Sequence, residues 1–131
     1  MVLAGADGAV RELAARLNAP VVPTQMALGV VASDHASFIG HGGLIAGDAV
    51  REAFASADVI VAIGCRFSSW MWDERGPLAR REHALININL DPSALGSPAL
   101  HTVAMQADAK HALDDLLAAM AGRAVATEAA W

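Results

Sequence analysis

DVIVAIG, residues 58–64, is a continuous apolar run that begins at an aspartate and ends at a glycine. Its β-branched residues favour an extended strand, and its apolar residues do not alternate with polar ones. A strand that is apolar on both faces is covered on both faces, as in the parallel sheets of α/β proteins. The segment therefore predicts a buried parallel strand and an α/β fold.

Strand and helix signals alternate on both sides of this segment. Short apolar runs predict further strands at residues 1–4, 20–23, 84–89 and 102–105, and a loop with four glycines spans residues 24–43. Apolar stripes at helical spacing predict helices over residues 9–17, around residues 50–57, and after Asp108 as N-cap, with Gly122 just past the last helix. We expect a Rossmann-like, doubly wound, mostly parallel sheet of about five to six strands with helices on both faces. Residues 1–122 would form this domain and residues 123–131 a linker or tail.

Composition excludes several classes of protein. The 131 residues are 55% hydrophobic and 18% charged, which is typical of a folded domain rather than a disordered chain. A net charge of −5 argues against a nucleic-acid partner, and the longest apolar run is too short to span a membrane. A single cysteine, Cys65, excludes an internal disulfide, and no signal peptide precedes the first strand. These features predict a cytoplasmic location.

The turns that follow the predicted strands meet at one edge of such a sheet, where ligands bind in this fold class. Glycines and helix N-termini at that edge suit a phosphate, Arg66 would reach a phosphate or ribose, and Asp91 would accept a ribose hydroxyl. The candidate cofactor-binding residues are Gly5, Thr24, Gln25, Met26, Gly40, His41, Gly42, Gly43, Gly64, Cys65, Arg66, Asn89, Asp91 and Asp108.

Each candidate also has a purely structural interpretation. Glycines after strands are common turn formers, Arg66 would equally pair with a carboxylate, and Cys65 would pack in a turn. Asp91 precedes a proline as turn starters do, and Asp108 is explained as an N-cap. No G-x-G-x-x-G follows a strand, which disfavours a dehydrogenase. The five histidines lack metal-ligand spacing, so we predict no metal site and no catalytic residue in this chain.

Five segments in the same order resemble the acetolactate synthase-like family of thiamine-diphosphate-dependent enzymes. LNAPVVPT at residues 17–24 resembles its "LGAPVVTT", and ADVIVAIGCRF at residues 57–67 resembles "ADLVLALGARF". INLDP at residues 88–92 is similar to "IDIDP", and ADAK at residues 107–110 is similar to "GDAK". DH at residues 34–35 with FIGHGG at residues 38–43 is similar to "DHPLFLGMHG". The series covers almost the whole chain between residues 20 and 120.

The resemblance implies a middle domain of a three-domain enzyme. In that family the outer domains bind thiamine diphosphate and Mg²⁺ between subunits of an oligomer, and they carry the activating glutamate and the G-D-G…N-N metal motif. Neither feature occurs in this sequence. The middle domain holds FAD in several members, ADP or a CoA nucleotide in others, and nothing in the rest.

Three departures from the family pattern bear on the nucleotide. Ser68, Ser69 and Trp70 replace the residues after "GARF" that supply a second arginine in FAD-binding members. Asn89 replaces the first aspartate of "IDID". The turn and helix over residues 5–17 are several residues shorter than in the family.

Two hypotheses about function follow. In the first, the chain is the middle scaffold or nucleotide-binding domain of a 2-keto acid carboligase or decarboxylase and is inactive alone, with the outer domains as partners. In the second, it is a free-standing nucleotide-binding sensor or assembly module without catalysis. Binding of FAD, ADP or CoA by the isolated chain would favour the second.

Overall fold

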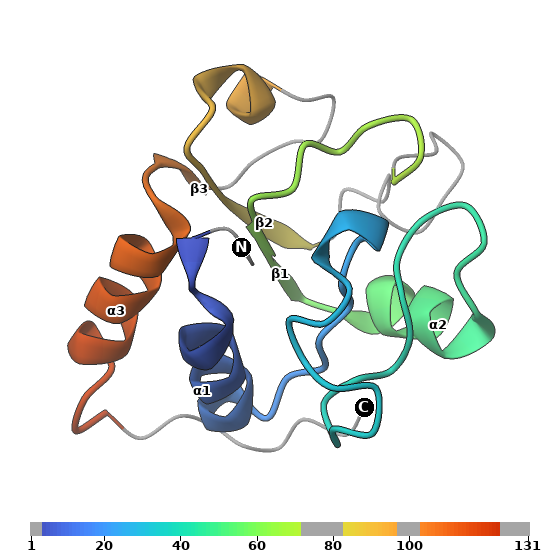
Figure 1. Ribbon diagram of the computed structural model, residues 1–131, viewed down its shortest axis with the longest axis horizontal. Coiled ribbons are helices and arrows are strands. Elements are labelled where there is room, and N and C mark those ends of the chain that lie inside the picture. The colour runs from blue at the N-terminus through green and yellow to red at the C-terminus, as the bar shows by residue number, and fades with distance from the viewer. Residues whose placement is uncertain (1–3, 72–82, 97–102, 124–131) are drawn as a thin grey trace.

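The computed structural model describes residues 4–71, 83–96 and 103–123. Three strands form a parallel sheet in the order β1-β2-β3, with β1 at Val59–Ile63, β2 at Ala84–Asn89 and β3 at Val103–Gln106 (Figure 1). Three α-helices accompany it, namely α1 (Asp7–Leu17), α2 (Asp48–Ser56) and α3 (Ala109–Ala119). Two short 3₁₀ helices, η2 (Gln25–Ala27) and η4 (Pro92–Gly96), lie in the connections. The prediction of an α/β fold with a parallel sheet is confirmed.

The predicted number of five to six strands is wrong for the described residues, which contain three. Residues 20–23 form only a single bridge, in which Val21 pairs with Phe38. Prolines at both ends of that segment lack the N–H groups that a longer ladder needs. Residues 1–3 and Thr102 of two other predicted strands lie outside the described residues, and Ala4 belongs to a helical turn.

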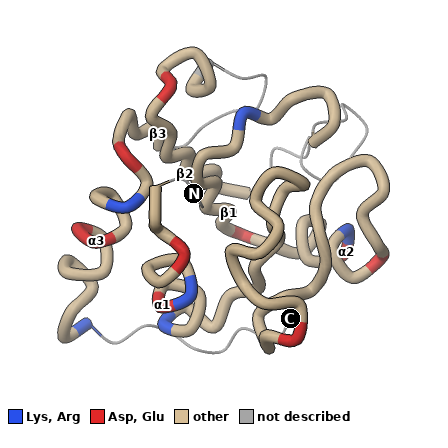
Figure 2. Tube along the Cα trace, in the orientation of Figure 1, with Lys and Arg blue, Asp and Glu red and all other residues tan. Residues whose placement is uncertain are grey.

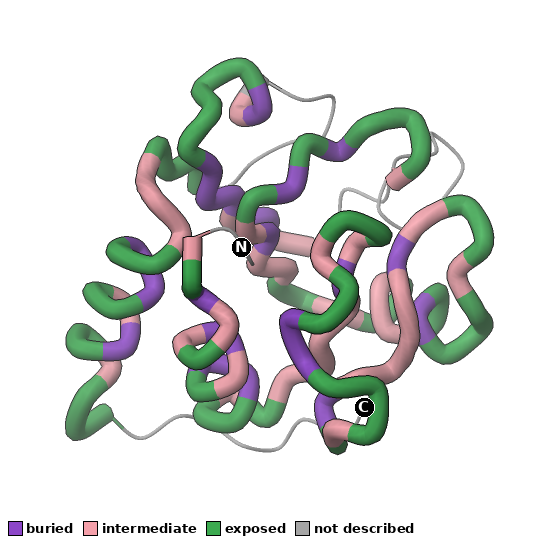
Figure 3. Tube along the Cα trace, in the orientation of Figure 1, coloured by how far each residue is buried: buried purple, intermediate pink, exposed green. Residues whose placement is uncertain are grey.

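The middle strand, β2, is the buried centre of the sheet. Ile88 and Asn87 of β2 are at most 2% exposed, whereas all four residues of the edge strand β3 are exposed (Figure 3). Strand β1 is intermediate, because Ala62 is buried and Val59 at its start is exposed. The unbroken apolar pattern of residues 58–64 thus predicted a strand correctly but overstated its burial.

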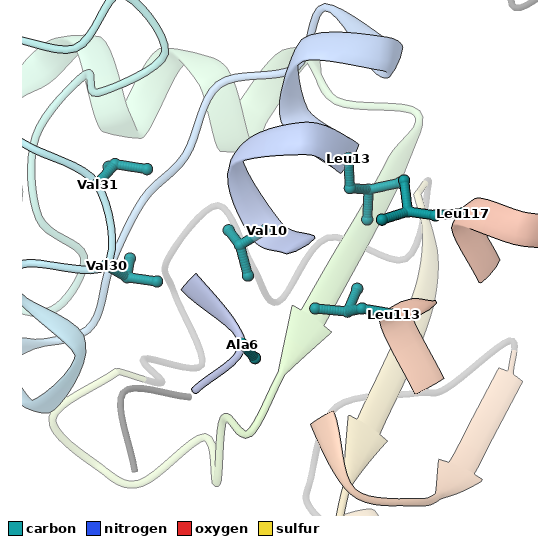
Figure 4. Packing of buried hydrophobic residues seen from close by; sticks show 7 residues of the cluster. All are labelled: Ala6, Val10, Leu13, Val30, Val31, Leu113 and Leu117. Atoms are coloured by element: carbon teal, nitrogen blue, oxygen red, sulfur yellow. The ribbon is translucent and has the colours of Figure 1, made fainter. Parts of the chain in front are cut away.

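The main core lies where α1 and α3 pack against each other beside the sheet (Figure 4). Val10 and Leu13 of α1 meet Leu113 and Leu117 of α3. Residues 30 and 31, both valines, close the cluster from the loop after η2. Arg16 Nη1 donates to the Leu117 carbonyl over 3.1 Å, so a polar contact joins the two helices as well.

A smaller core forms on the other face of β1 and β2. Ala62 and Leu85 from the strands pack against Cys65 and Phe67 from the turn after β1. Asn87 lies next to Leu85 on this face of β2 and donates from Nδ2 to the Ala94 carbonyl of η4 over 3.3 Å. Among the described residues, no helix combines the length and the apolar character that a membrane span requires.

Candidate functional site

The carboxyl ends of the three strands meet at one edge of the sheet, as the sequence predicts. Gly64 N–H donates to the Ile88 carbonyl over 2.8 Å, and Ala107 N–H donates to the Asn89 carbonyl over 3.1 Å. These bonds place the turns at residues 64–66, 89–91 and 106–108 side by side, and we call them the strand-end edge. Six of the predicted site residues lie there: Gly64, Cys65, Arg66, Asn89, Asp91 and Asp108.

Asn89 connects two of these turns. Its Nδ2 donates to the Cys65 carbonyl over 3.1 Å, and its Oδ1 accepts from Asp91 N–H over 3.1 Å. The side chain is 7% exposed. A carboxylate has no donor for the Cys65 carbonyl, so only an amide satisfies both contacts. The departure from the family's aspartate at this position therefore has a structural role.

The Asp91 carboxylate accepts hydrogen bonds from its own turn. Ser93 donates to Asp91 Oδ1 twice, from Oγ over 2.7 Å and from N–H over 2.9 Å. These two bonds hold the pKa of Asp91 below its ordinary value, and the positive charge of Arg66 adds a smaller effect. Asp91 is therefore an ionised turn residue at neutral pH, and its role toward a ribose stays a prediction.

Cys65 is buried beside Phe67 at the end of β1. Burial raises the pKa of its thiol, and a backbone hydrogen bond with Phe67 opposes that shift only in part. Nucleophilic cysteines have a lowered pKa, so the Cys65 thiol is a packing group. The burial of Cys65 thus supports the interpretation that it packs in the turn after β1.

Asp108 is the N-cap of α3, as predicted from the sequence. Its Oδ1 accepts from Lys110 N–H over 2.9 Å and from His111 N–H over 3.2 Å. The carboxylate thus satisfies two N–H groups that the helix leaves free.

Gly5 lies beside the same edge. It has φ 63° and leads into Ala6, whose side chain is fully buried in the α1–α3 core (Figure 4). Ile63, the last residue of β1, packs against that core. The turn before α1 therefore lies next to the end of β1.

Thr24, Gln25 and Met26 form a separate turn at the start of η2. Ala27 N–H donates to the Thr24 carbonyl over 2.8 Å, and Val30 N–H donates to the Ala27 carbonyl over 3.1 Å. Val30 is fully buried against α1, which fixes the position of η2, while the Met26 side chain is 91% exposed.

The glycines at residues 40–43 make room for close packing. A Cβ on Gly40 would lie 2.9 Å from Val50 Cγ2, and one on Gly42 would lie 2.8 Å from Met71 Cε. A Cβ on Gly43 would lie 3.1 Å from Trp70 Nε1. The Gly42 N–H is used by the Pro23 carbonyl at 2.9 Å. Close packing together with a left-handed φ explains the glycines at positions 40 and 43, whereas the flexible end of Met71 would yield to a Cβ on Gly42. The predicted contact of these residues and His41 with a nucleotide stays a prediction.

We expect Gly40→Ala to destabilise the fold by about 1–3 kcal/mol, because it combines a φ of 130° with the clash against Val50. Urea unfolding followed by circular dichroism measures the change. Gly8→Ala is the control, since a Cβ there meets nothing within 4 Å and the residue lies in α1. That control should be neutral or stabilise by up to about 1 kcal/mol. Equal stability of the two variants would contradict the packing role of Gly40.

Several residues that shape this region were not singled out from the sequence. Asp7 at the start of α1 pairs with Arg11 over 2.8 Å, Ser93 binds Asp91, and Asn87 is fully buried. An aspartate in a first helical turn and an asparagine inside an apolar strand were the available signals. Across residues 4–71, 83–96 and 103–123, no group of three His, Cys, Asp or Glu side chains is placed to bind a metal ion.

Comparison with known proteins identifies the family of this chain. Residues 1–116 match the family model described as thiamine pyrophosphate enzyme, central domain. The probable acetolactate synthase large subunit of Methanocaldococcus jannaschii is 31% identical over 131 residues, which is 100% of this chain and 22% of that protein. The pyruvate oxidase of Lactiplantibacillus plantarum is 28% identical over 112 residues, covering 86% of this chain and 18% of that protein. The chain thus spans about a fifth of the length of these relatives, and it belongs to the family of thiamine pyrophosphate enzyme central domains.

Proposed function

We propose that this chain is the middle scaffold domain of a thiamine-diphosphate-dependent 2-keto acid carboligase or decarboxylase, and that it does not catalyse the reaction alone. The observation that carries the proposal is the match of residues 1–116 to the central-domain family. Its relatives include enzymes named acetolactate synthase and pyruvate oxidase, which use the matching segment as about a fifth of a longer chain.

The family resemblance places thiamine diphosphate and its Mg²⁺ ion in the outer domains, and this sequence lacks the G-D-G…N-N motif that binds the metal there. The cofactor and Mg²⁺ are therefore assigned to the outer domains of the parent enzyme in this proposal. A cytoplasmic location and a homo-oligomeric parent belong to the same proposal.

The alternative, a free-standing nucleotide-binding sensor, has less support. The matching relatives named acetolactate synthase large subunit contain the corresponding segment as about a fifth of their length. The nucleotide itself, FAD or ADP, stays a prediction for the strand-end edge, and the charges of that edge argue against it, as set out below.

The purified chain tests the proposal directly. With pyruvate, added thiamine diphosphate and Mg²⁺, we expect no release of CO₂ and no heat of thiamine diphosphate binding in calorimetry. The DNA on both sides of the coding region should encode segments that bind thiamine diphosphate. Turnover of pyruvate by the chain alone, or a gene that starts at Met1 and stops after Trp131, would refute the proposal.

A further inference from the structure

The N-terminus of α1 is where a phosphate would be expected in this kind of fold. Helix N-termini leave free N–H groups and a partial positive charge, and dinucleotide folds place a pyrophosphate on the first of them. The backbone of the turn before α1 would allow a phosphate to approach the helix. Gly5 is in a left-handed conformation, and a Cβ on Gly5 or Gly8 would meet nothing within 4 Å. A phosphate therefore has room at this helix start.

The carboxylate of Asp7 already occupies this helix start. Arg11 Nη2 donates to Asp7 Oδ2 over 2.8 Å. That bond is the main cause of the lowered pKa of Asp7, with smaller effects from its own backbone N–H, from the charge of Arg11 and from the N–H of Gly8. Arg11 is itself fixed, because its Nη1 donates to the Val30 carbonyl over 3.2 Å. The negative charge is thus held in place by residues of the same chain.

Acidic residues also stand at the other helix starts of the strand-end edge, and Figure 2 marks Asp and Glu in red along the chain. Asp91 accepts from Ser93 at the start of η4, and Asp108 accepts from Lys110 and His111 at the start of α3. Among the cations beside these starts, Arg11 is paired with Asp7, and the Lys110 side chain is paired with Asp114. Among the described residues, the cations of this edge thus lie beside acidic side chains, since Arg66 also acts on the charge of Asp91. A dinucleotide would bring further negative charge to these helix starts.

We infer that Asp7 takes the place of a nucleotide phosphate at the start of α1, and that the strand-end edge of this domain consequently excludes FAD and ADP. Two like charges at contact distance repel by an amount that weakens binding about tenfold or more. The family resemblance suggested a nucleotide at this edge, whereas these charges indicate a domain that works without one. The inference concerns the ligand alone, so it is tested separately from the enzymatic role proposed above.

Calorimetry of the full chain with ADP, and flavin fluorescence titration with FAD, test the inference. The wild-type chain should show no saturable binding of either ligand. Asp7→Asn should show saturable ADP binding, with a Kd at least about tenfold below the lower limit that the wild-type titration sets, and it should bind still more tightly at low ionic strength. Adenosine, which has no phosphate, should bind equally to both proteins.

Glu12→Gln is the matched control. Glu12 lies on the same helix and pairs with Arg16 over 2.8 Å at the same spacing, yet it lies a full turn beyond the helix start. This variant should behave like the wild type. Asp7→Ser supplies a second neutral side chain at the same position in case Asp7→Asn folds poorly. Tight binding of FAD or ADP by the wild type, or no gain in folded Asp7 variants, would overturn the inference.

Discussion

Asn87→Asp should lower the free energy of unfolding by about 3–5 kcal/mol at pH 7, because it places an uncompensated charge in the buried face of β2. Asn87 is fully buried between Ala62 and Ala104 on the neighbouring strands. Within the described part of the chain its Oδ1 has no hydrogen-bond partner, and its Nδ2 donates to the Ala94 carbonyl. An aspartate at this position would lose the donor to the Ala94 carbonyl, and its negative charge would have no partner.

The effect of this substitution should depend on pH. Burial without a donor raises the pKa of the new carboxyl in the folded state above its value in the unfolded chain. The folded protein then resists ionisation while the unfolded chain ionises freely, so the destabilisation grows as pH rises from the unfolded pKa to the folded pKa. Urea unfolding at pH 7 and at about pH 4.5, each compared with the wild type, should show a smaller loss at the lower pH.

Asn87→Leu is the control for this prediction. It has a similar volume, removes the unpaired oxygen and leaves the Ala94 carbonyl without its donor, so we expect a loss of about 1–2 kcal/mol. Since no new charge is introduced, this loss should be the same at both pH values. An equal cost of Asn87→Asp at pH 7 and pH 4.5 would contradict a buried, unpartnered position.

Helices and strands that are specified by the residues within them or directly beside them were predicted well from the sequence. Helix α1 was expected over residues 9–17 and spans Asp7–Leu17, and the N-cap role of Asp108 is confirmed. The parallel pairing of β1 with β2 follows from two apolar runs separated by a long connection. For α1 and for the N-cap of α3, a periodic pattern or a capping side chain lies within a few residues of the structure that it specifies.

Features that depend on contacts distant in sequence were not predicted. Phe38 bridges Val21 across sixteen intervening residues, so residues 20–23 show an extended pattern without a strand partner of their own. The packing of the glycines at residues 40–43 against Val50, Trp70 and Met71 was not predicted, because these contacts are invisible in a linear sequence. The pairing of Asp7 with Arg11 has helical spacing, yet its importance appears only when the helix start is placed beside β1.

Leu113→Ala should destabilise the protein by about 3–5 kcal/mol, since it opens a cavity in the contact between α1 and α3. Leu113 is fully buried and belongs to the cluster that contains Ala6, Val10 and Val30. Helix α1 with its N-cap and the loop at Val30 therefore pack with α3 in this one cluster, and they cannot all move inward to fill the space. A small domain has roughly 5–15 kcal/mol of stability, so this one substitution removes a large fraction of it.

Urea unfolding measures the loss as a lower midpoint with an unchanged slope. Leu90→Ala is the control, because Leu90 is 67% exposed in the turn after β2 and should change stability by less than about 0.5 kcal/mol. A folded Leu113→Ala protein should also expose more of the turn before α1, because Ala6 packs in the same cluster. Faster amide hydrogen exchange in residues 6–10 than in the wild type would report that change. If Leu113→Ala cost no more than Leu90→Ala, the α1–α3 contact would not be the centre of the core, and the position of Asp7 at the strand-end edge would have to be fixed by other residues.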